Sequence, residues 1–149
     1  CRWCGTLSWS GAGVRNVYVV GSLHNPLVTE VANRLREAGH EVFDDWHAPG
    51  PDTDSFWREY EEGRGRTYIE ALAGKHAKNV FDFDMVNLHA ADTVVLILPT
   101  GKSAHMEIGY AVGVGKDCYI ILDGEAHWEV MYRLVKVLPS VESLLETWK

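Results

Sequence analysis

One stretch constrains the fold of this chain more than any other, an apolar, β-branched run that turns sharply into a helix-like segment. Residues 93–98 read Thr-Val-Val-Leu-Ile-Leu, which is typical of a buried strand, and Pro-Thr-Gly-Lys follows at residues 99–102. A helical pattern then begins near Ser103, which we expect to be the N-cap, and continues to about Gly113. The stretch therefore predicts a strand, a tight loop and a helix N-terminus in direct succession.

Glu107 is a candidate functional residue because of its place in this helix. With Ser103 as the cap, its carboxylate lies near the end of the first turn, where free backbone amides and the helix dipole favour the charged form. An ionised carboxylate at the mouth of a strand can act as a nucleophile. Ordinary compensation of the helix dipole explains the same residue, and both interpretations stay open at this point.

Strand and helix patterns alternate along the rest of the chain. Besides residues 93–98, strands are predicted at 16–20, 40–44, 117–122 and 135–137, and helices at 26–38, 67–90 with a break near Gly74, 126–134 and 141–148. The alternation is typical of an α/β fold with a mostly parallel five-stranded sheet covered on both faces. Ligands of such sheets bind where the strand order reverses, which brings together the loops after residues 20 and 98.

Residues 45–66 break the alternation. Two prolines and a glycine at 49–51 and glycines at 63 and 65 punctuate a polar stretch that carries Trp46, Phe56, Trp57 and Tyr60. A loop this long is typical of a lid or a binding loop, whose aromatic rings can stack on a planar ligand. The alternative is a short helix that Trp57 and Tyr60 fix to the core.

Asp84 is the second carboxylate of interest. It shares a helix face with Val80 and Leu88, so we expect its carboxylate to point toward the core near the strand ends. A carboxylate there needs a partner or a function. Asp82, four residues after Lys78, instead fits an ordinary solvated ion pair.

Composition narrows the class of protein. The 14 basic and 21 acidic side chains give a net charge of −7, which disfavours polymeric nucleic acid as a partner and favours small ligands. No apolar run approaches the ~20 residues of a membrane span and no signal-peptide pattern opens the sequence, so we expect a cytoplasmic protein with no membrane contact. We expect one domain over residues 16–149, preceded by a loose extension at 1–15.

Cysteine and histidine spacing predicts no metal site and no cofactor. Cys1 and Cys4 have the spacing of half a zinc site, but no second pair follows, and Cys118 falls in a predicted core strand. The seven histidines form no helical pair, although His24 and His105 stand at predicted strand ends.

Four segments together resemble the nucleoside 2-deoxyribosyltransferase family, which includes deoxynucleoside 5′-monophosphate N-glycosidases. They are Val-Tyr-Val-Val-Gly-Ser at 17–22, Phe-Asp-Met-Val-Asn-Leu-His-Ala-Ala-Asp at 83–92, His-Met-Glu-Ile-Gly-Tyr-Ala at 105–111, and Gly-Lys at 115–116. The resemblance spans roughly residues 16–122 and is closest to deoxyribosyltransferase-like proteins often encoded by phages. The segment at 105–111 is the most specific of the four.

The resemblance implies a flavodoxin-like, Rossmann-like three-layer fold and a retaining displacement at the anomeric carbon. Glu107 matches the nucleophile of the family, Asp84 its acid or base at the nucleobase, and Tyr18 the tyrosine beneath the nucleophile. Such chemistry needs one ionised carboxylate to attack C1′ and one carboxyl to protonate the departing base. We expect the helix N-terminus to favour charged Glu107, and burial to raise the pKa of Asp84.

We expect the substrate to contact both loops and the nearby aromatic rings, at Gly21, Ser22, His24, Asn25, Trp46, Trp57, Gly101, Lys102, Ser103 and Met106. Transferases of the family place an Asp six residues before the nucleophile for the sugar 5′-hydroxyl, where this chain has Gly101. Lys102 and Ser103 suit a 5′-phosphate better, although a solvated Lys102 and a merely capping Ser103 fit equally. The resemblance also implies a homo-oligomer.

The sequence therefore predicts an enzyme of nucleotide metabolism and salvage. It would transfer or hydrolyse the N-glycosidic bond of 2′-deoxynucleosides or their 5′-monophosphates through a glycosyl intermediate on Glu107. Two alternatives stay open: cleavage of NAD or a related dinucleotide by the same carboxylate, and a nucleotide sensor without turnover.

Overall fold

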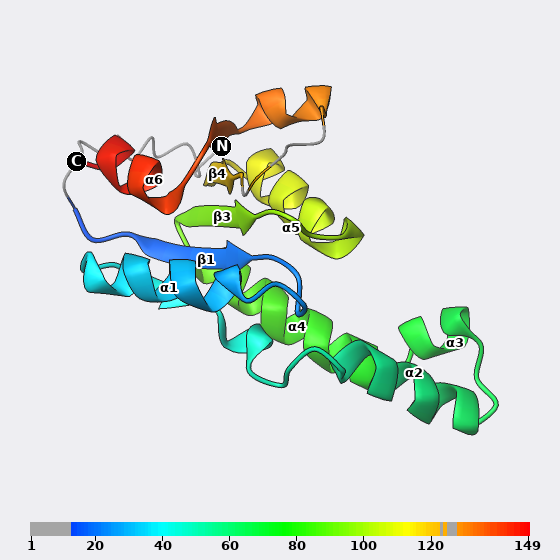
Figure 1. The fold of residues 1–149 in the computed structure, drawn as a ribbon. Coiled ribbons are helices and arrows are strands. Elements are labelled where there is room, and N and C mark those ends of the chain that lie inside the picture. The colour runs from blue at the N-terminus through cyan, green and yellow to red at the C-terminus, as the bar shows by residue number, and fades with distance from the viewer. Residues whose placement is uncertain (1–12, 123, 125–127) are drawn as a thin grey trace.

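The sheet of this protein has five parallel strands. The computed structural model describes residues 13–122, 124 and 128–149 (Figure 1). Across the sheet the strands are β2 (Glu41–Phe43), β1 (Asn16–Val20), β3 (Thr93–Ile97), β4 (Asp117–Ile121) and β5 (Lys136–Leu138). The direction of winding reverses between β1 and β3, which is the flavodoxin-like order. The fold class expected from the sequence is confirmed.

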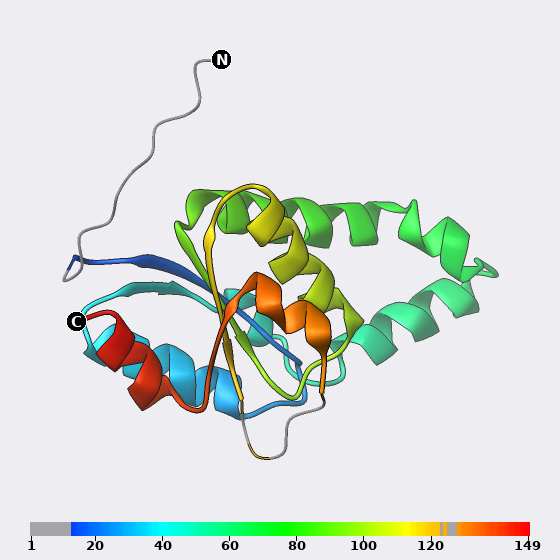
Figure 2. The ribbon, with the colours of Figure 1, turned by 90° about the horizontal axis from the view of Figure 1, so that it is seen from above.

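Helices cover both faces of the sheet, as Figure 2 shows from above. Because side chains alternate along a strand, Val17 and Val19 of β1 pack with α1 (Leu27–Glu37) and α6 (Val141–Thr147), whereas Tyr18 and Val20 pack on the opposite side. That opposite side is covered by α4 (Lys75–Ala90) and α5 (Lys102–Gly113). All five residues of β3 are buried, as expected of the central strand of a parallel sheet.

A helical arm extends from the carboxyl edge of the sheet (Figure 1). It consists of α2 (Thr53–Gly63), α3 (Tyr68–Leu72) and the first turns of α4, and it follows a short 3-10 turn, η1 (Asp45–His47). We call residues 53–79 the arm. A long loop over 45–66 is therefore wrong, because the prolines and glycines fall before α2 or near its end and not in its interior. The alternative of a short helix is right, although Tyr60 is 56% exposed and does not fix that helix to the core.

Two further expectations are corrected at helix ends. The N-cap of α5 is Gly101 and not Ser103, so the helix begins at Lys102 and Glu107 falls in its second turn. The helix expected over 126–134 is a 3-10 turn, η2 (Val130–Leu134), and residues 126 and 127 lie outside the described part of the chain. The break near Gly74 is confirmed, because α3 ends at Leu72 and α4 begins at Lys75.

The start of the described chain is tied to the sheet. Arg15 donates to Asp117 at 2.6 Å and to the hydroxyl of Thr93 at 3.0 Å. Cys1 and Cys4 lie outside the described residues, and Cys118 is buried in the core as expected. No helix in the described ranges has the length and apolar character to cross a bilayer.

Candidate active site

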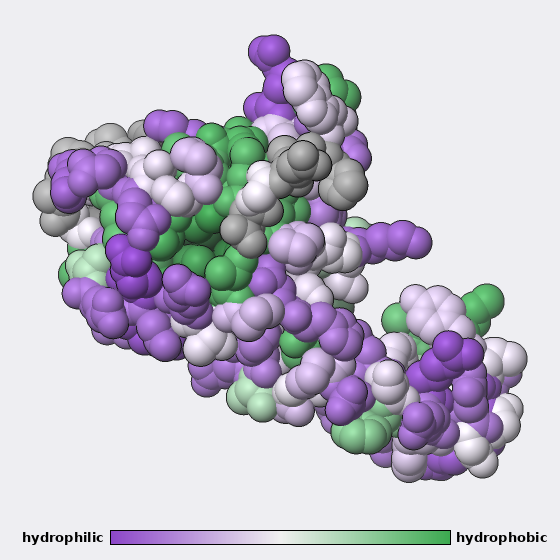
Figure 3. All heavy atoms as spheres, in the orientation of Figure 1, coloured by the Kyte–Doolittle hydropathy of each residue, from purple (hydrophilic) through white to green (hydrophobic). Residues whose placement is uncertain are grey.

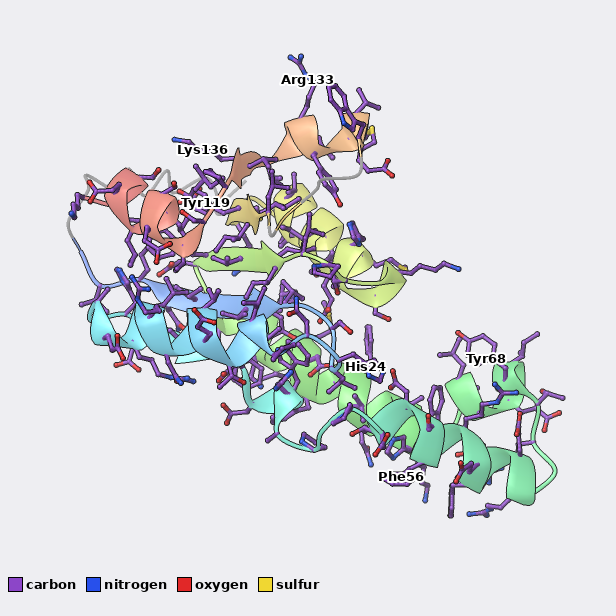
Figure 4. The ribbon with its side chains drawn as sticks, in the orientation of Figure 1. His24, Phe56, Tyr68, Tyr119, Arg133 and Lys136 are labelled. Carbon is purple, nitrogen blue, oxygen red and sulfur yellow. The ribbon has the colours of Figure 1, made fainter. Side chains whose placement is uncertain are left out.

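A cleft of about 840 Å³ opens at the carboxyl edge of the sheet, beside the reversal between β1 and β3. Its walls come from the loop after β1, from η1 and the start of α2, from one face of α4, and from the loop after β3 with the first turns of α5. Figure 4 places His24 between this edge and the arm. Parallel α/β sheets bind their ligands at this position.

Glu107 and Tyr18 meet at the base of the cleft. Tyr18 is fully buried on β1, and its hydroxyl donates to Oε1 of Glu107 at 3.0 Å. The Tyr18 ring is held by stacking on Phe43, with centroids 5.3 Å apart and planes 19° apart. A rigid strand thus orients the carboxylate that α5 presents to the cleft.

Asp84 reaches the same cleft from α4. Its Oδ1 is buried and has no hydrogen-bond partner among the described residues. Unsatisfied buried polar atoms are uncommon in proteins because each costs roughly 1–3 kcal/mol. Asp84 therefore offers the cleft an oxygen that a ligand can satisfy.

Both carboxyl groups have pKa values well above the ordinary range. Burial raises the pKa of Asp84 to about 6. Burial also raises the pKa of Glu107 to about 7, the charge of Asp84 adds to this rise, and the Tyr18 hydrogen bond opposes it. The expectation that the helix N-terminus keeps Glu107 charged is wrong, since Glu107 lies beyond the first turn and desolvation dominates.

The two loops of the cleft are fixed to each other and to α1. Asn25 is 6% exposed; its Nδ2 donates to the carbonyl of Pro99 at 3.3 Å, and its Oδ1 accepts from the amide of Leu27 at 3.0 Å. Gly21 is required by close packing, because a Cβ there would lie 2.7 Å from a methyl group of Val28. These contacts set the shape of the cleft floor.

Most of the site residues expected from the sequence line this one cleft: Gly21, Ser22, His24, Trp46, Asp84, Gly101, Lys102, Ser103 and Glu107. Tyr18 lies beneath it. Asn25 joins the loops below the wall and does not line the cleft, and Met106 is 77% exposed and points elsewhere. Trp57 lies in the arm, on a different cavity, because α2 carries it away from the sheet.

Several lining residues were missed by sequence reasoning. Asn79 and Phe83 share the face of α4 that carries Asp84, a relation that helical spacing could have indicated. Asp54 and Thr53 come from α2, which lay inside the segment interpreted as a loop. Thr100 contributes a buried hydroxyl without a partner in the described ranges.

The described residues contain no cluster of three His, Cys, Asp or Glu side chains that could hold a metal ion. His105 is engaged by other groups, since its Nε2 contacts the Tyr132 hydroxyl at 2.8 Å and its Nδ1 the Gly101 carbonyl at 2.7 Å. The cleft holds Asp84 and Glu107, whose carboxyl groups can act as acid, base or nucleophile.

Comparison with known proteins gives one informative result. No protein-family model matches the sequence, and the comparison with curated proteins finds no match. A solved structure of similar fold is the 2-deoxyribosyltransferase of the psychrotolerant bacterium Bacillus psychrosaccharolyticus, with 16% identity and a TM-score of 0.55. The match covers 86% of this chain and 88% of that chain. The fold that the sequence resemblance implied is thus the fold of a solved 2-deoxyribosyltransferase.

Proposed function

We propose that this protein breaks the N-glycosidic bond of 2′-deoxynucleosides or their 5′-monophosphates and passes the sugar to a second base or to water. The observation that carries the proposal is the presence of Asp84 and Glu107, from two different helices, in one cleft at the reversal of the sheet. The similar fold of the Bacillus psychrosaccharolyticus 2-deoxyribosyltransferase, described as a biocatalyst for nucleoside synthesis, supports it.

The two carboxyl groups take complementary roles in this reaction. The carboxylate of Glu107 attacks C1′ and forms a glycosyl ester as the bond from C1′ to the base nitrogen breaks. Asp84 gives its proton to the departing base. In the second half of the reaction Asp84 takes a proton from the incoming base or water, which attacks C1′ and releases Glu107.

The proposed roles need one proton on the pair, carried by Asp84 and not by Glu107 when the substrate binds. The pKa values of about 6 for Asp84 and about 7 for Glu107 lie near neutrality, so the pair retains a shared proton over that range, and without a substrate the higher pKa places that proton mainly on Glu107. Two features act in the opposite direction. Glu107 accepts a hydrogen bond from Tyr18, which favours its charged form. Oδ1 of Asp84 has no donor in the described part of the chain, which favours the neutral acid there.

Different walls of the cleft suit different parts of a nucleotide. Lys102 and Ser103 at the start of α5 provide a cation, a hydroxyl and free backbone amides for a 5′-phosphate. Asp45 and Asp54 stand on the η1 and α2 wall and repel an anion from that side. Phe83, next to Asp84, offers a ring face to the nucleobase.

We also propose that the protein forms a homo-oligomer. On α4 and α5, which cover one face of the sheet, Phe81, Val86 and Met106 are 62%, 68% and 77% exposed. Large apolar side chains that are this exposed favour an interface between protein chains. Light scattering on the purified chain should give a mass above that of one 16.7 kDa chain, and Val86→Glu should lower it.

Two measurements test the proposed chemistry. Incubation with each deoxynucleoside and deoxynucleotide, with and without a free base, separates transfer from hydrolysis. Mass spectrometry after reaction with a 2-fluoro sugar analogue should find a glycosyl adduct on the peptide that contains Glu107. Unchanged substrates and no adduct would reject the proposal, nicotinamide release from NAD would favour a dinucleotide substrate, and binding without turnover would favour a sensor.

A further inference from the structure

The arm contains a second cavity, of about 990 Å³, between α2, α3 and the start of α4. Among described residues it shares Pro49, Thr53 and Asn79 with the catalytic cleft, while Asp84 and Glu107 line the cleft alone. Figure 4 shows Phe56 and Tyr68 on the two sides of the arm. A cavity of this size can hold a ligand as large as a nucleotide.

One wall of this cavity is formed by the ring of Trp57, whose indole N–H has no hydrogen-bond acceptor among the described residues. The ring of Trp57 stacks on His76, with centroids 6.0 Å apart and planes 27° apart, and meets Tyr68 edge to face at 6.5 Å. Nε1 of Trp57 is buried and has no acceptor in the described ranges. Buried indole N–H groups usually have a hydrogen-bond partner. A ligand with a planar ring and an acceptor atom would supply that partner to Nε1 of Trp57.

The charged side chains of the lining are three cations, Arg64, Arg66 and Lys75, and two carboxylates, Glu61 and Glu70, although the chain as a whole carries a charge of −7. Arg64 and Lys75 line the cavity, with the Arg64 guanidinium 5.2 Å from the centre of the Tyr60 ring. Arg66 donates at 3.0 Å to Glu61, which is only 3% exposed. The lining therefore carries a small excess of positive charge, which favours an anion over a neutral ligand.

The arm buries few side chains in α2 and α3 and leaves large aromatic side chains exposed. Glu61 and Ala71 are the residues buried in α2 and α3, whereas Phe56 and Tyr60 are 64% and 56% exposed. Figure 3 shows hydrophobic and hydrophilic residues side by side over the arm. Because Glu61 is buried and its partner Arg66 is half-buried, this ion pair stabilises the arm less than apolar packing at the same place would.

We propose that the arm cavity is a binding site for a heteroaromatic anion of the nucleotide class. The planar ring lies against Trp57 and accepts a hydrogen bond from its Nε1, and the anionic group lies against Arg64 and Lys75. The site adjoins the catalytic cleft through the three residues they share, but Asp84 and Glu107 do not line it, and it does not depend on the function proposed for them.

The test uses the full chain labelled with 5-fluorotryptophan and observed by ¹⁹F NMR, with the Trp57 resonance assigned through Trp57→Phe. Titration with adenosine 5′-monophosphate should shift this resonance saturably. Adenosine should bind about tenfold more weakly, and inorganic phosphate should leave the resonance unmoved at the same concentrations. Lys75→Gln should weaken binding of the monophosphate about tenfold, while Lys78→Gln, on the same helix outside the cavity, should not.

Three results would overturn the proposal. The first is no shift of the Trp57 resonance with the monophosphate. The second is a shift that Lys102→Gln abolishes and Lys75→Gln does not, since the ligand would then sit in the catalytic cleft. The third is a Trp57 resonance whose position changes with protein concentration and not with ligand concentration. In that case a second copy of the chain would fill the cavity. None of these results depends on enzymatic turnover.

Discussion

The buried hydroxyl of Tyr18 donates a hydrogen bond of 3.0 Å to Oε1 of Glu107, and so connects β1 to the first turns of α5. The relationship matters because Glu107 is otherwise poorly solvated. Burial raises its pKa, and this hydrogen bond is the contact that favours the charged form. A carboxylate that is oriented and still incompletely stabilised is suited to attack.

Removal of that donor tests its role. Tyr18→Phe should lower kcat/KM roughly tenfold to a hundredfold, because a preorganised hydrogen bond at the nucleophile is lost. Since the bond lowers the pKa of Glu107, its loss should also move the acid limb of the pH profile to higher pH. The measurement is kcat/KM against pH, with Tyr119→Phe on β4 as a matched control that changes neither value. A profile that keeps its position would mean that Tyr18 only packs.

Loss of the second carboxyl should depend on the leaving group. Asp84→Asn should slow cleavage of natural deoxynucleosides by about 10²–10⁴-fold, because proton transfer to the base is lost. A substrate whose leaving group needs no proton should lose much less. Asp82→Asn, an exposed neighbour paired with Lys78, is the control. Equal losses for both kinds of substrate would contradict a role for Asp84 as the acid.

The buried carboxyl of Glu107 should make stability depend on pH. Its pKa rises from an ordinary 4.5 to about 7 on folding, so the folded chain holds the proton more tightly than the unfolded chain. Stability from this group is complete below about pH 4.5 and falls as the pH rises through about 7. Glu107→Gln should therefore stabilise the protein by up to about 3 kcal/mol near pH 8 and by almost nothing near pH 4.

Urea unfolding of parent and variant at the two pH values measures this difference. Glu146→Gln, which removes an exposed carboxylate from α6, should change the free energy of unfolding little at either pH. A Glu107→Gln variant that is less stable than the parent near pH 8 would show that the carboxylate is not held in an unfavourable site.

The start of α5 should discriminate between nucleosides and nucleotides. If Lys102 contacts a 5′-phosphate, Lys102→Gln should lower kcat/KM about tenfold or more for a 5′-monophosphate and leave the nucleoside unchanged. The difference should shrink as salt increases, because Lys102 is exposed. Comparison of both substrates in parent, variant and Lys78→Gln gives the answer, and an equal effect on both would place the phosphate elsewhere.

Local sequence patterns determined most of the fold. The β-branched run at 93–98, the helical spacing around Leu35 and the left-handed Gly39 specify elements whose order predicts a parallel sheet with two covered faces. These features could be read from the sequence because they depend on near neighbours in the chain. The same patterns indicated Asp84 and Glu107, each on a helix face directed toward the strand ends.

Only the tertiary structure decided how these two groups behave. The pKa of Glu107 is set by what covers the side chain, and that cover comes from β1 and α4, which are distant in sequence. The tertiary structure also decided the place of Trp57, because only the start of α2 lines the cleft, whereas Trp57 packs on α3 and α4 and lines the arm cavity. Periodicity reports which residues face inward, whereas desolvation and cavity shape depend on partners that the fold alone brings together.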